Sequence, residues 1–276
     1  MPLSPAGRSH GPARLSDGSG ESSGGRRRRC EVDERSPAPG APGAEPPGSL
    51  EALLARHAPA DVQASLRPSA RGELASVGST QVHAILVVGD LRLSGLVLRE
   101  AVSPTLYARF VVGFTEAVRS LSSSCGAWFD KFTGDGFVAF WLYEDEHRLP
   151  AGVIPEFCQS VLPASERLVS NLRRNSRNFP VGVGLSLGLD SGPCELVRIG
   201  ETITIVGSPI VGATRMAAGA RAGETIANVH LGDLLEEELR RREMPNLAVE
   251  RATVATKEYP EGQEAYRLSF PKSRDA

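Results

Sequence analysis

The pattern of hydrophobic and polar positions changes along the chain and predicts both strands and helices. The apolar run within Gln81–Gly89 is short, which is typical of a buried strand. Ser103 and Pro104 form a typical helix start, because a capping hydroxyl precedes a proline in the first turn. Apolar residues then recur at helical spacing through Leu121. We therefore expect a buried strand followed by a long amphipathic helix.

The segments that follow continue this mixture of periods. Thr133-Gly134-Asp135 separates two apolar runs and predicts a hairpin, and Gly200-Glu201 predicts another. The expected elements are strands at Ala127–Phe132 and Gly136–Leu142, a helix at 155–174, strands at Val181–Asp190, Cys194–Ile199 and Thr202–Val206, a helix at 208–221, a strand at Glu224–Asn228, a helix at 230–243, and strands at 247–256 and 263–270. This order predicts an α+β fold in which a mixed sheet is flanked by helices.

The first residues have a composition unlike the rest of the chain. Half of residues 1–50 are Gly, Pro or Ser, and none is aromatic. Such a segment buries too little apolar surface to offset its chain entropy, so residues 1–48 are expected to form a disordered tail. Its basic run Arg26–Arg29 is expected to be a solvated charge cluster.

The remainder is expected to form one domain with a short helical preface. Within residues 49–79, Ser49 is expected to cap a first helix, and a second helix is expected after Pro59. The domain itself is expected at 80–270, followed by a tail at 271–276.

Composition and charge exclude several classes of protein. The chain has 31 basic and 33 acidic residues and a net charge of −2, so a general nucleic-acid contact is not expected. No apolar run approaches the roughly 20 residues that span a bilayer, and no secretory signal is present. The 4 cysteines are scattered, which argues against a disulfide scaffold or a zinc site. A cytoplasmic protein without membrane contact is expected.

Two aspartates are candidates for metal binding. Asp90 follows the first strand and Asp135 lies at the tip of the first hairpin. In a βαββ unit the crossover helix returns the chain beside its start, so these two carboxylates are expected to meet. Oxygen ligands of this kind suit Mg²⁺ or Mn²⁺, and two such ions stabilise the attacking and leaving oxygens of a phosphoryl transfer. The alternative is that Asp135 is only a turn residue.

Several ordered motifs resemble the class III nucleotidyl cyclase catalytic domain. They are Asp90 at a strand end, the hairpin Lys131-Phe132-Thr133-Gly134-Asp135, the glycine-containing strand Val183–Gly192 and the strand-to-helix segment Ile205–Arg215. The resemblance covers about residues 80–270. It implies a ferredoxin-like βαββαβ core and a head-to-tail homodimer with active sites at the interface. Asp90 and Asp135 of one chain would face Lys131, Thr204 and Arg215 of the other.

The resemblance also implies a role for each matching residue. Asp90, Asp135 and the Leu91 carbonyl would hold two Mn²⁺ or Mg²⁺ ions, Lys131 and Thr204 would read the base, Arg215 would stabilise the reacting phosphate, and Lys257 would bind the triphosphate. Two parts of the chain depart from the family. Val211 stands where a ribose-orienting asparagine is usual, and the segment Asp90–Gly95 stands where the family more often has a Gly-Phe-Thr type ending.

A narrower resemblance concerns the string Trp128–Gly136, which is similar to stand-alone bacterial pyrimidine cyclases of antiphage defence (Pycsar-type). It implies cyclic UMP or cyclic CMP made from UTP or CTP with Mn²⁺, and a separate effector protein that responds to the cyclic nucleotide. Two alternatives stay open. Lys131 and Thr204 favour adenine, hence ATP and cyclic AMP. Val211 favours a degenerate cyclase domain that binds nucleotide without turnover.

Overall fold

The computed structural model describes residues 48–100, 103–144, 152–242 and 247–270. Apart from Gly48, the predicted disordered tail at 1–48 lies outside these residues, and so does the predicted tail at 271–276. The division of the chain into domains therefore stays a prediction. No helix within the described ranges combines the length and apolar character that a membrane span requires.

Three short helices precede the sheet: α1 (Leu50–Ala55), α2 (Ala60–Gln63) and α3 (Pro68–Ser76). The Ser49 hydroxyl accepts a hydrogen bond from the Ala52 amide at 3.1 Å, which confirms the predicted cap. Helices α1 and α2 were expected, whereas α3 was not. Helix α3 has few apolar positions, and Ala70 and Leu74 are its buried residues, so its hydrophobic pattern in the sequence is weak.

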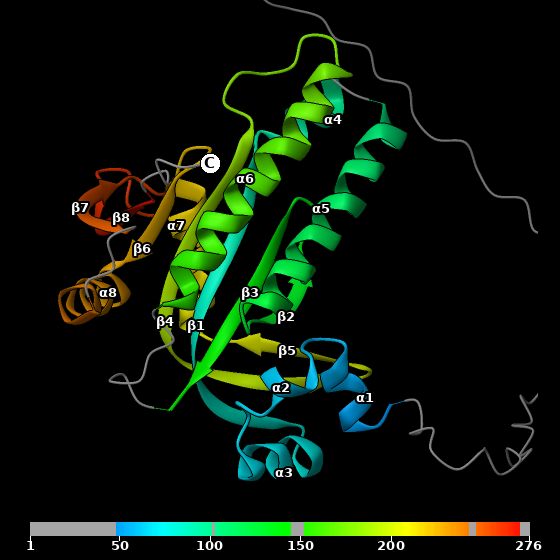
Figure 1. Cartoon of the computed structure of the whole chain (residues 1–276), viewed down its shortest axis with the longest axis vertical. Coiled ribbons are helices and arrows are strands. Elements are labelled where there is room, and N and C mark those ends of the chain that lie inside the picture. Colours follow the sequence, from blue (N-terminus) through cyan, green and yellow to red (C-terminus); the bar gives the residue numbers. More distant parts are fainter. Residues whose placement is uncertain (1–47, 101–102, 145–151, 243–246, 271–276) are drawn as a thin grey trace, which may run out of the picture. The chain divides into compact units, whose positions relative to one another are not determined.

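The eight strands of the described residues form one mixed sheet, as predicted (Figure 1). They are β1 (Ser79–Arg92), β2 (Trp128–Phe132), β3 (Gly136–Tyr143), β4 (Gly184–Ile199), β5 (Thr202–Val206), β6 (Thr225–Asn228), β7 (Ala248–Val254) and β8 (Gln263–Ser269). The spatial order is β2-β3-β1-β4-β6-β8-β7, and β5 pairs with β4. Strands β4 and β6 are parallel, and the other pairs are antiparallel.

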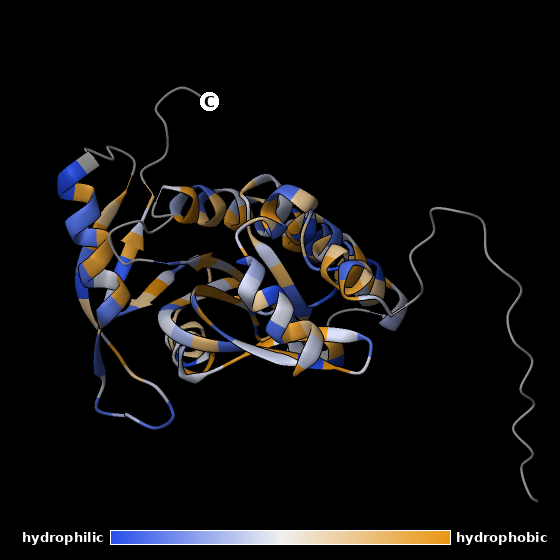
Figure 2. Cartoon of the chain, turned by 90° about the horizontal axis from the view of Figure 1, so that it is seen from below, coloured by the Kyte–Doolittle hydropathy of each residue, from blue (hydrophilic) through white to orange (hydrophobic). Residues whose placement is uncertain are grey.

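The helices that alternate with the strands are α4 (Ser94–Glu100), α5 (Pro104–Ser124), α6 (Val153–Arg174), α7 (Ser208–Gly219) and α8 (Val229–Arg242). The Ser103 hydroxyl caps α5, as expected from the sequence. Alternate residues of β1 face opposite sides of the sheet. On one face, Ile85 and Val87 pack with residues of α5, α6 and α8. On the other face, Leu86 and Val88 pack with residues of α1–α3, β5 and α7. Figure 2 shows that hydrophobic positions line one side of these helices.

Two parts of the fold differ from the sequence prediction. Strand β4 is continuous, whereas separate strands at Val181–Asp190 and Cys194–Ile199 were expected. Gly192 and Pro193 do not break it, because both stay paired with β1, opposite Ala84 and His83. Helix α4 was also missed. It follows Leu93, whose φ of 63° is rare for a residue with a side chain.

Helix α7 lies directly against β4 at a glycine. A Cβ atom on Gly188 would stand 1.9 Å from the Ala213 carbonyl oxygen and 2.2 Å from the Ala217 nitrogen, both backbone atoms of α7. No rotamer change relieves such a contact, so only glycine permits this spacing. Since α7 carries Arg215, the position of this predicted site residue depends on Gly188.

We expect Gly188→Ala to lower the free energy of unfolding by about 3 kcal/mol or more, because the helix must move away from the sheet. Chemical denaturation of both proteins measures this change. Gly72→Ala is the matched control: it lies in α3 with nothing within 4 Å of the added Cβ, and alanine there is expected to stabilise by about 0.5–1 kcal/mol. Equal stability of Gly188→Ala and the unaltered protein would contradict this account.

Candidate functional site

The two predicted metal-binding aspartates lie together. Asp90 is opposite Gly136 in the β1–β3 ladder, and the Leu91 amide donates to the Asp135 carbonyl oxygen at 3.1 Å. The approach depends on two glycines: a Cβ on Gly89 would lie 2.2 Å from the Phe137 ring, and a Cβ on Gly136 would lie 2.2 Å from the Gly89 carbonyl oxygen. The β2–β3 turn therefore closes onto the end of β1.

Arg92, the last residue of β1, and Ser94, the first residue of α4, each contact one of the two carboxylates. Arg92 donates to Asp90 Oδ2 at 3.0 Å, and the Ser94 hydroxyl donates to Asp135 Oδ2 at 2.5 Å. Burial is the largest effect on the pKa of Asp90 and raises it above its ordinary value. Arg92 opposes this effect, and the charge of Asp135 raises the pKa further. The two carboxylates therefore lie close enough for the charge of one to affect the other, as expected for two ligands of one metal site.

Sequence reasoning did not assign Arg92 or Ser94 a role. The signal in the sequence was the segment Asp90–Gly95, which differs from the Gly-Phe-Thr type ending that is more common in class III cyclase domains. Their partners became apparent only in the folded chain.

The carboxylate pair fits a divalent cation whose other ligands come from a bound molecule. Within the described residues, no group of three or more His, Cys, Asp or Glu side chains is placed to hold a metal ion. Mg²⁺ is typically bound by one or two carboxylates together with water and substrate phosphates. Asp90 and Asp135 meet that description, and the role of the Leu91 carbonyl stays a prediction.

The two predicted base-reading residues also lie together. Lys131 Nζ donates to Thr204 Oγ1 at 2.8 Å, although 73 positions separate them in the sequence. A third residue, Asp130, contacts both: its Oδ2 forms an ion pair with Lys131 Nζ at 3.1 Å and accepts a hydrogen bond from Thr204 Oγ1 at 3.1 Å. Asp130 was not identified from the sequence. The signal was a charged residue inside the apolar string Trp128–Phe132.

The N-terminal helices hold β5 beside β2. His57 Nδ1 donates to the Phe129 carbonyl oxygen at 2.9 Å, and the Ile203 amide donates to His57 Nε2 at 3.4 Å. These partners require the tautomer with the proton on Nδ1. The Phe129 amide also donates to the His57 carbonyl oxygen at 2.8 Å. His57 thus joins the strand that carries Lys131 to the strand that carries Thr204.

Arg215 and Lys257 lie in a third group. Arg215 on α7 forms an ion pair with Glu258, the residue after Lys257. The turn that carries Glu258 is closed by the Thr256 amide, which donates to the Tyr259 carbonyl oxygen at 3.1 Å. The Arg215 side chain is 39% exposed, so its guanidinium can exchange Glu258 for another anion.

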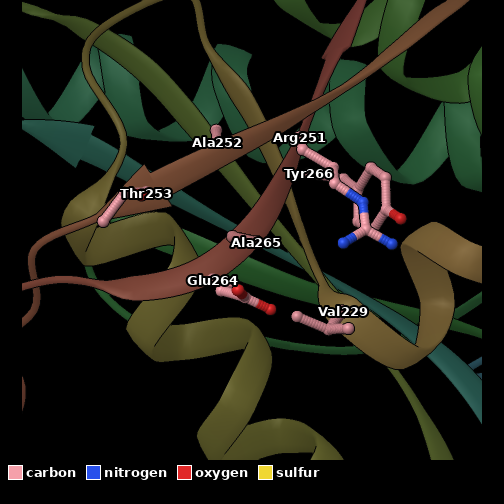
Figure 3. Close-up of a pocket in the computed structure, with 7 residues that line it drawn as sticks. All are labelled: Val229, Arg251, Ala252, Thr253, Glu264, Ala265 and Tyr266. Atoms are coloured by element: carbon pink, nitrogen blue, oxygen red, sulfur yellow. The ribbon is translucent and has the colours of Figure 1, made fainter.

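The hydrogen bonds and ion pairs among the described residues join no member of one of these three groups to a member of another. None of the predicted site residues lines the cavity of about 200 Å³ beside β7, β8 and the start of α8. Figure 3 shows this cavity, in which the Arg251 guanidinium lies over the Tyr266 ring. The predicted site residues therefore lie outside this cavity.

Comparison with solved structures shows the fold. The adenylyl cyclase CyaB from P. aeruginosa aligns with a TM-score of 0.57 and 15% identity, over 72% of this chain and 98% of that one. The guanylyl cyclase Cya2 aligns with 0.54 and 12%, over 72% and 98%. The catalytic core of a rhodopsin-guanylyl cyclase with converted specificity, in complex with ATPαS, aligns with 0.52 and 12%, over 70% and 98%.

No protein-family model and no curated protein matches the sequence. The structural neighbours are class III adenylyl and guanylyl cyclase domains, so the predicted class III cyclase-like fold is confirmed. Dimerisation and the individual site residues stay predictions.

We expect Arg92→Gln to tighten Mn²⁺ binding, because it removes a cation that competes for Asp90. The side chains of this pair are 33% and 36% exposed, so the change should be modest, about two- to fivefold in the half-saturating Mn²⁺ concentration. The increase in melting temperature during a Mn²⁺ titration measures it. Arg109→Gln on α5 controls for the loss of one positive charge. Weaker Mn²⁺ binding by Arg92→Gln would refute the competition.

Proposed function

We propose that this protein is a metal-dependent nucleotide cyclase, which converts a nucleoside triphosphate to a 3′,5′-cyclic nucleotide and pyrophosphate. The observation that carries this proposal is the Asp90–Asp135 pair, which lies at the end of β1 in the fold of adenylyl and guanylyl cyclase domains. Two adjacent carboxylates suit a metal–triphosphate complex, since the described residues contain no group of three or more His, Cys, Asp or Glu side chains placed to hold a metal ion.

The reaction replaces one phosphorus–oxygen bond by another. The ribose 3′-oxygen bonds to the α-phosphorus, the bond to pyrophosphate breaks, and the 3′-hydroxyl proton passes to solvent. Mn²⁺ or Mg²⁺ held by Asp90 and Asp135 would supply the positive charge that acidifies the 3′-hydroxyl and neutralises the phosphates.

The other groups bind and orient the substrate. Lys131 and Thr204 hold the base, and Lys257 binds the triphosphate. Arg215 exchanges Glu258 for the α-phosphate, where its planar guanidinium matches the developing charge. No covalent intermediate with the protein is needed.

We propose that two chains assemble head to tail and complete each site between them. The single chain keeps its carboxylate pair, its base-reading pair and Arg215 in three unconnected groups. A second copy would bring the Asp90 and Asp135 of one chain to the Lys131, Thr204 and Arg215 of the other. The symmetry of a dimer would then give two equivalent sites.

For the base, we propose a pyrimidine, as the string Trp128–Gly136 indicates, with signalling to a separate effector in antiviral defence. The second candidate is ATP, which Lys131 and Thr204 favour, since a lysine donor can bond a ring nitrogen of adenine. Base choice on this fold is open to change, because the rhodopsin-guanylyl cyclase core has converted specificity.

A domain that binds nucleotide without turnover is a further candidate function. Val211 on α7 is 49% exposed and offers no hydrogen bond where the family has an asparagine. Loss of one transition-state contact typically lowers the rate by about 10²–10³. We therefore expect slow turnover rather than none.

Incubation of the full chain with ATP, CTP, GTP and UTP separately, in Mn²⁺, is expected to give one main cyclic product by mass spectrometry. Asp135→Asn is expected to lower its formation by about 10³ or more, since the cation loses a ligand. Ser94→Ala, which removes only the hydrogen bond to Asp135, controls for disturbance of the loop. Retained activity in Asp135→Asn, or no product from any nucleotide, would contradict the proposed function.

Mixing two inactive variants tests the interface. Asp135→Asn and Arg215→Ala disable different halves of a shared site, so half of randomly mixed dimers retain one intact site of two. The mixture is expected to recover about one quarter of the unaltered activity. An equal mixture of Asp90→Asn and Asp135→Asn, which disable the same half, is expected to recover none. Equal recovery in both mixtures, or in neither, would refute a site shared between chains.

A further inference from the structure

Asp130 stands in an unusual place for a charged residue. Its side chain is 1% exposed. The pairing of β2 with β3 shifts register between Phe129 and Lys131, so Asp130 is the extra residue of a β-bulge. Bulges of this kind redirect side chains and occur often beside active sites. Here the bulge places the carboxylate against the two residues proposed to hold the base.

The protons of this group can be assigned from its chemistry. An ionised carboxylate only accepts hydrogen bonds, and a lysine ammonium only donates them. Thr204 must therefore donate its single proton to Asp130 and accept from Lys131. Lys131 uses one N–H on Thr204 and forms an ion pair with Asp130. One lone pair of Thr204 is left over, and Lys131 keeps N–H groups that are not used on Thr204.

The burial of Asp130 has no evident structural benefit. Its Oδ1 is buried and has no hydrogen-bond partner among the described residues. A buried carboxylate oxygen without a donor is destabilising, and an apolar side chain of similar size would avoid that cost. A role in ordering Lys131 and Thr204 accounts for an acid at this position.

We propose that Asp130 is a positioning residue that fixes the base-reading pair as one donor and one acceptor, and thereby sets base selectivity. This inference rests on the proposed function. By holding the Thr204 proton, Asp130 makes Thr204 an acceptor toward the base, while Lys131 stays a donor. Asp130 itself need not contact the nucleotide.

Selectivity follows from the order of groups on the base. At C6 of a purine or C4 of a pyrimidine, adenine and cytosine carry an amine, which donates, whereas guanine and uracil carry a carbonyl, which accepts. A fixed donor beside a fixed acceptor matches only one of these orders. A Thr204 hydroxyl that is free to rotate donates as well as accepts, so it no longer rejects the wrong exocyclic group.

The test compares kcat/KM for ATP, CTP, GTP and UTP in the full chain. The quantity of interest is the ratio between the best amino-base nucleotide and the best keto-base nucleotide. We expect this ratio to differ from one in the unaltered protein and to move toward one by about tenfold or more in Asp130→Leu. In a Thr204→Val background, the same substitution is expected to change the ratio by less than about twofold, because the hydroxyl it orients is absent.

Two further variants keep the result decisive. Asp233→Leu removes a carboxylate that bonds Tyr266 far along the chain, and it should leave the ratio unchanged. If Asp130→Leu does not fold, Asp130→Asn keeps the side-chain shape without the charge and should move the ratio in the same direction. An unchanged ratio in a folded Asp130 variant, or an effect that persists in full in the Thr204→Val background, overturns the inference and leaves the proposed function standing.

Absence of turnover is a separate outcome. If no nucleotide yields a product, the proposed function fails, and the ratio is then taken from dissociation constants of the same four nucleotides by calorimetry. A binding ratio that moves toward one in Asp130→Leu supports the inference for a binding domain. Equal binding of all four by the unaltered protein, or no binding, overturns it as well.

Discussion

The double pairing of β1 is the constraint on which the candidate site depends. This strand bonds to β4 from Ser79 to Arg92 and to β3 from His83 to Asp90. Its pairing with β3 carries the hairpin tip, and with it Asp135, to the end of β1. Its pairing with β4 fixes the sheet on which α7 and β5 are built, and these elements carry Arg215 and Thr204. The elements that carry Lys131, Thr204 and Arg215 each pack directly on β1 or on one of the two strands paired with it.

The elements of the candidate site approach one another closely at glycine residues. Gly89 and Gly136 leave no space for a side chain between β1 and the hairpin, and Gly188 leaves none between β4 and α7. The charge of Asp135 raises the pKa of Asp90, and burial, the largest effect, raises it as well. Arg92 and Ser94 donate hydrogen bonds to these two carboxylates in the single chain. A bound metal cation would stabilise the same two carboxylates, so Arg92 and Ser94 would compete with the cation for Asp90 and Asp135.

The base-reading group follows a different principle. Lys131 donates to Thr204, and both contact the buried Asp130, Thr204 by a hydrogen bond and Lys131 by an ion pair. The strands that carry them are joined by His57 from the helical segment before the sheet. A segment outside the predicted 80–270 domain thus helps to place residues within it. The buried Oδ1 of Asp130 has no hydrogen-bond partner among the described residues, so this acid lowers stability where the apolar residues around it raise it.

The sequence by itself determined the element types, the mixed α+β class and most of the candidate residues, because these follow from local periodicity, capping and short motifs. Asp90 and Asp135 could be named in this way, whereas Lys131, Thr204 and Arg215 were named from the resemblance to class III cyclase domains. It did not reveal the continuity of β4, because Gly192 and Pro193 resemble a break unless β1 is known to pair beyond them. It also did not reveal the partners Arg92, Ser94, Asp130, His57 and Glu258. Their roles depend on contacts between residues far apart in the chain, and such contacts exist only once the sheet has brought the strands together.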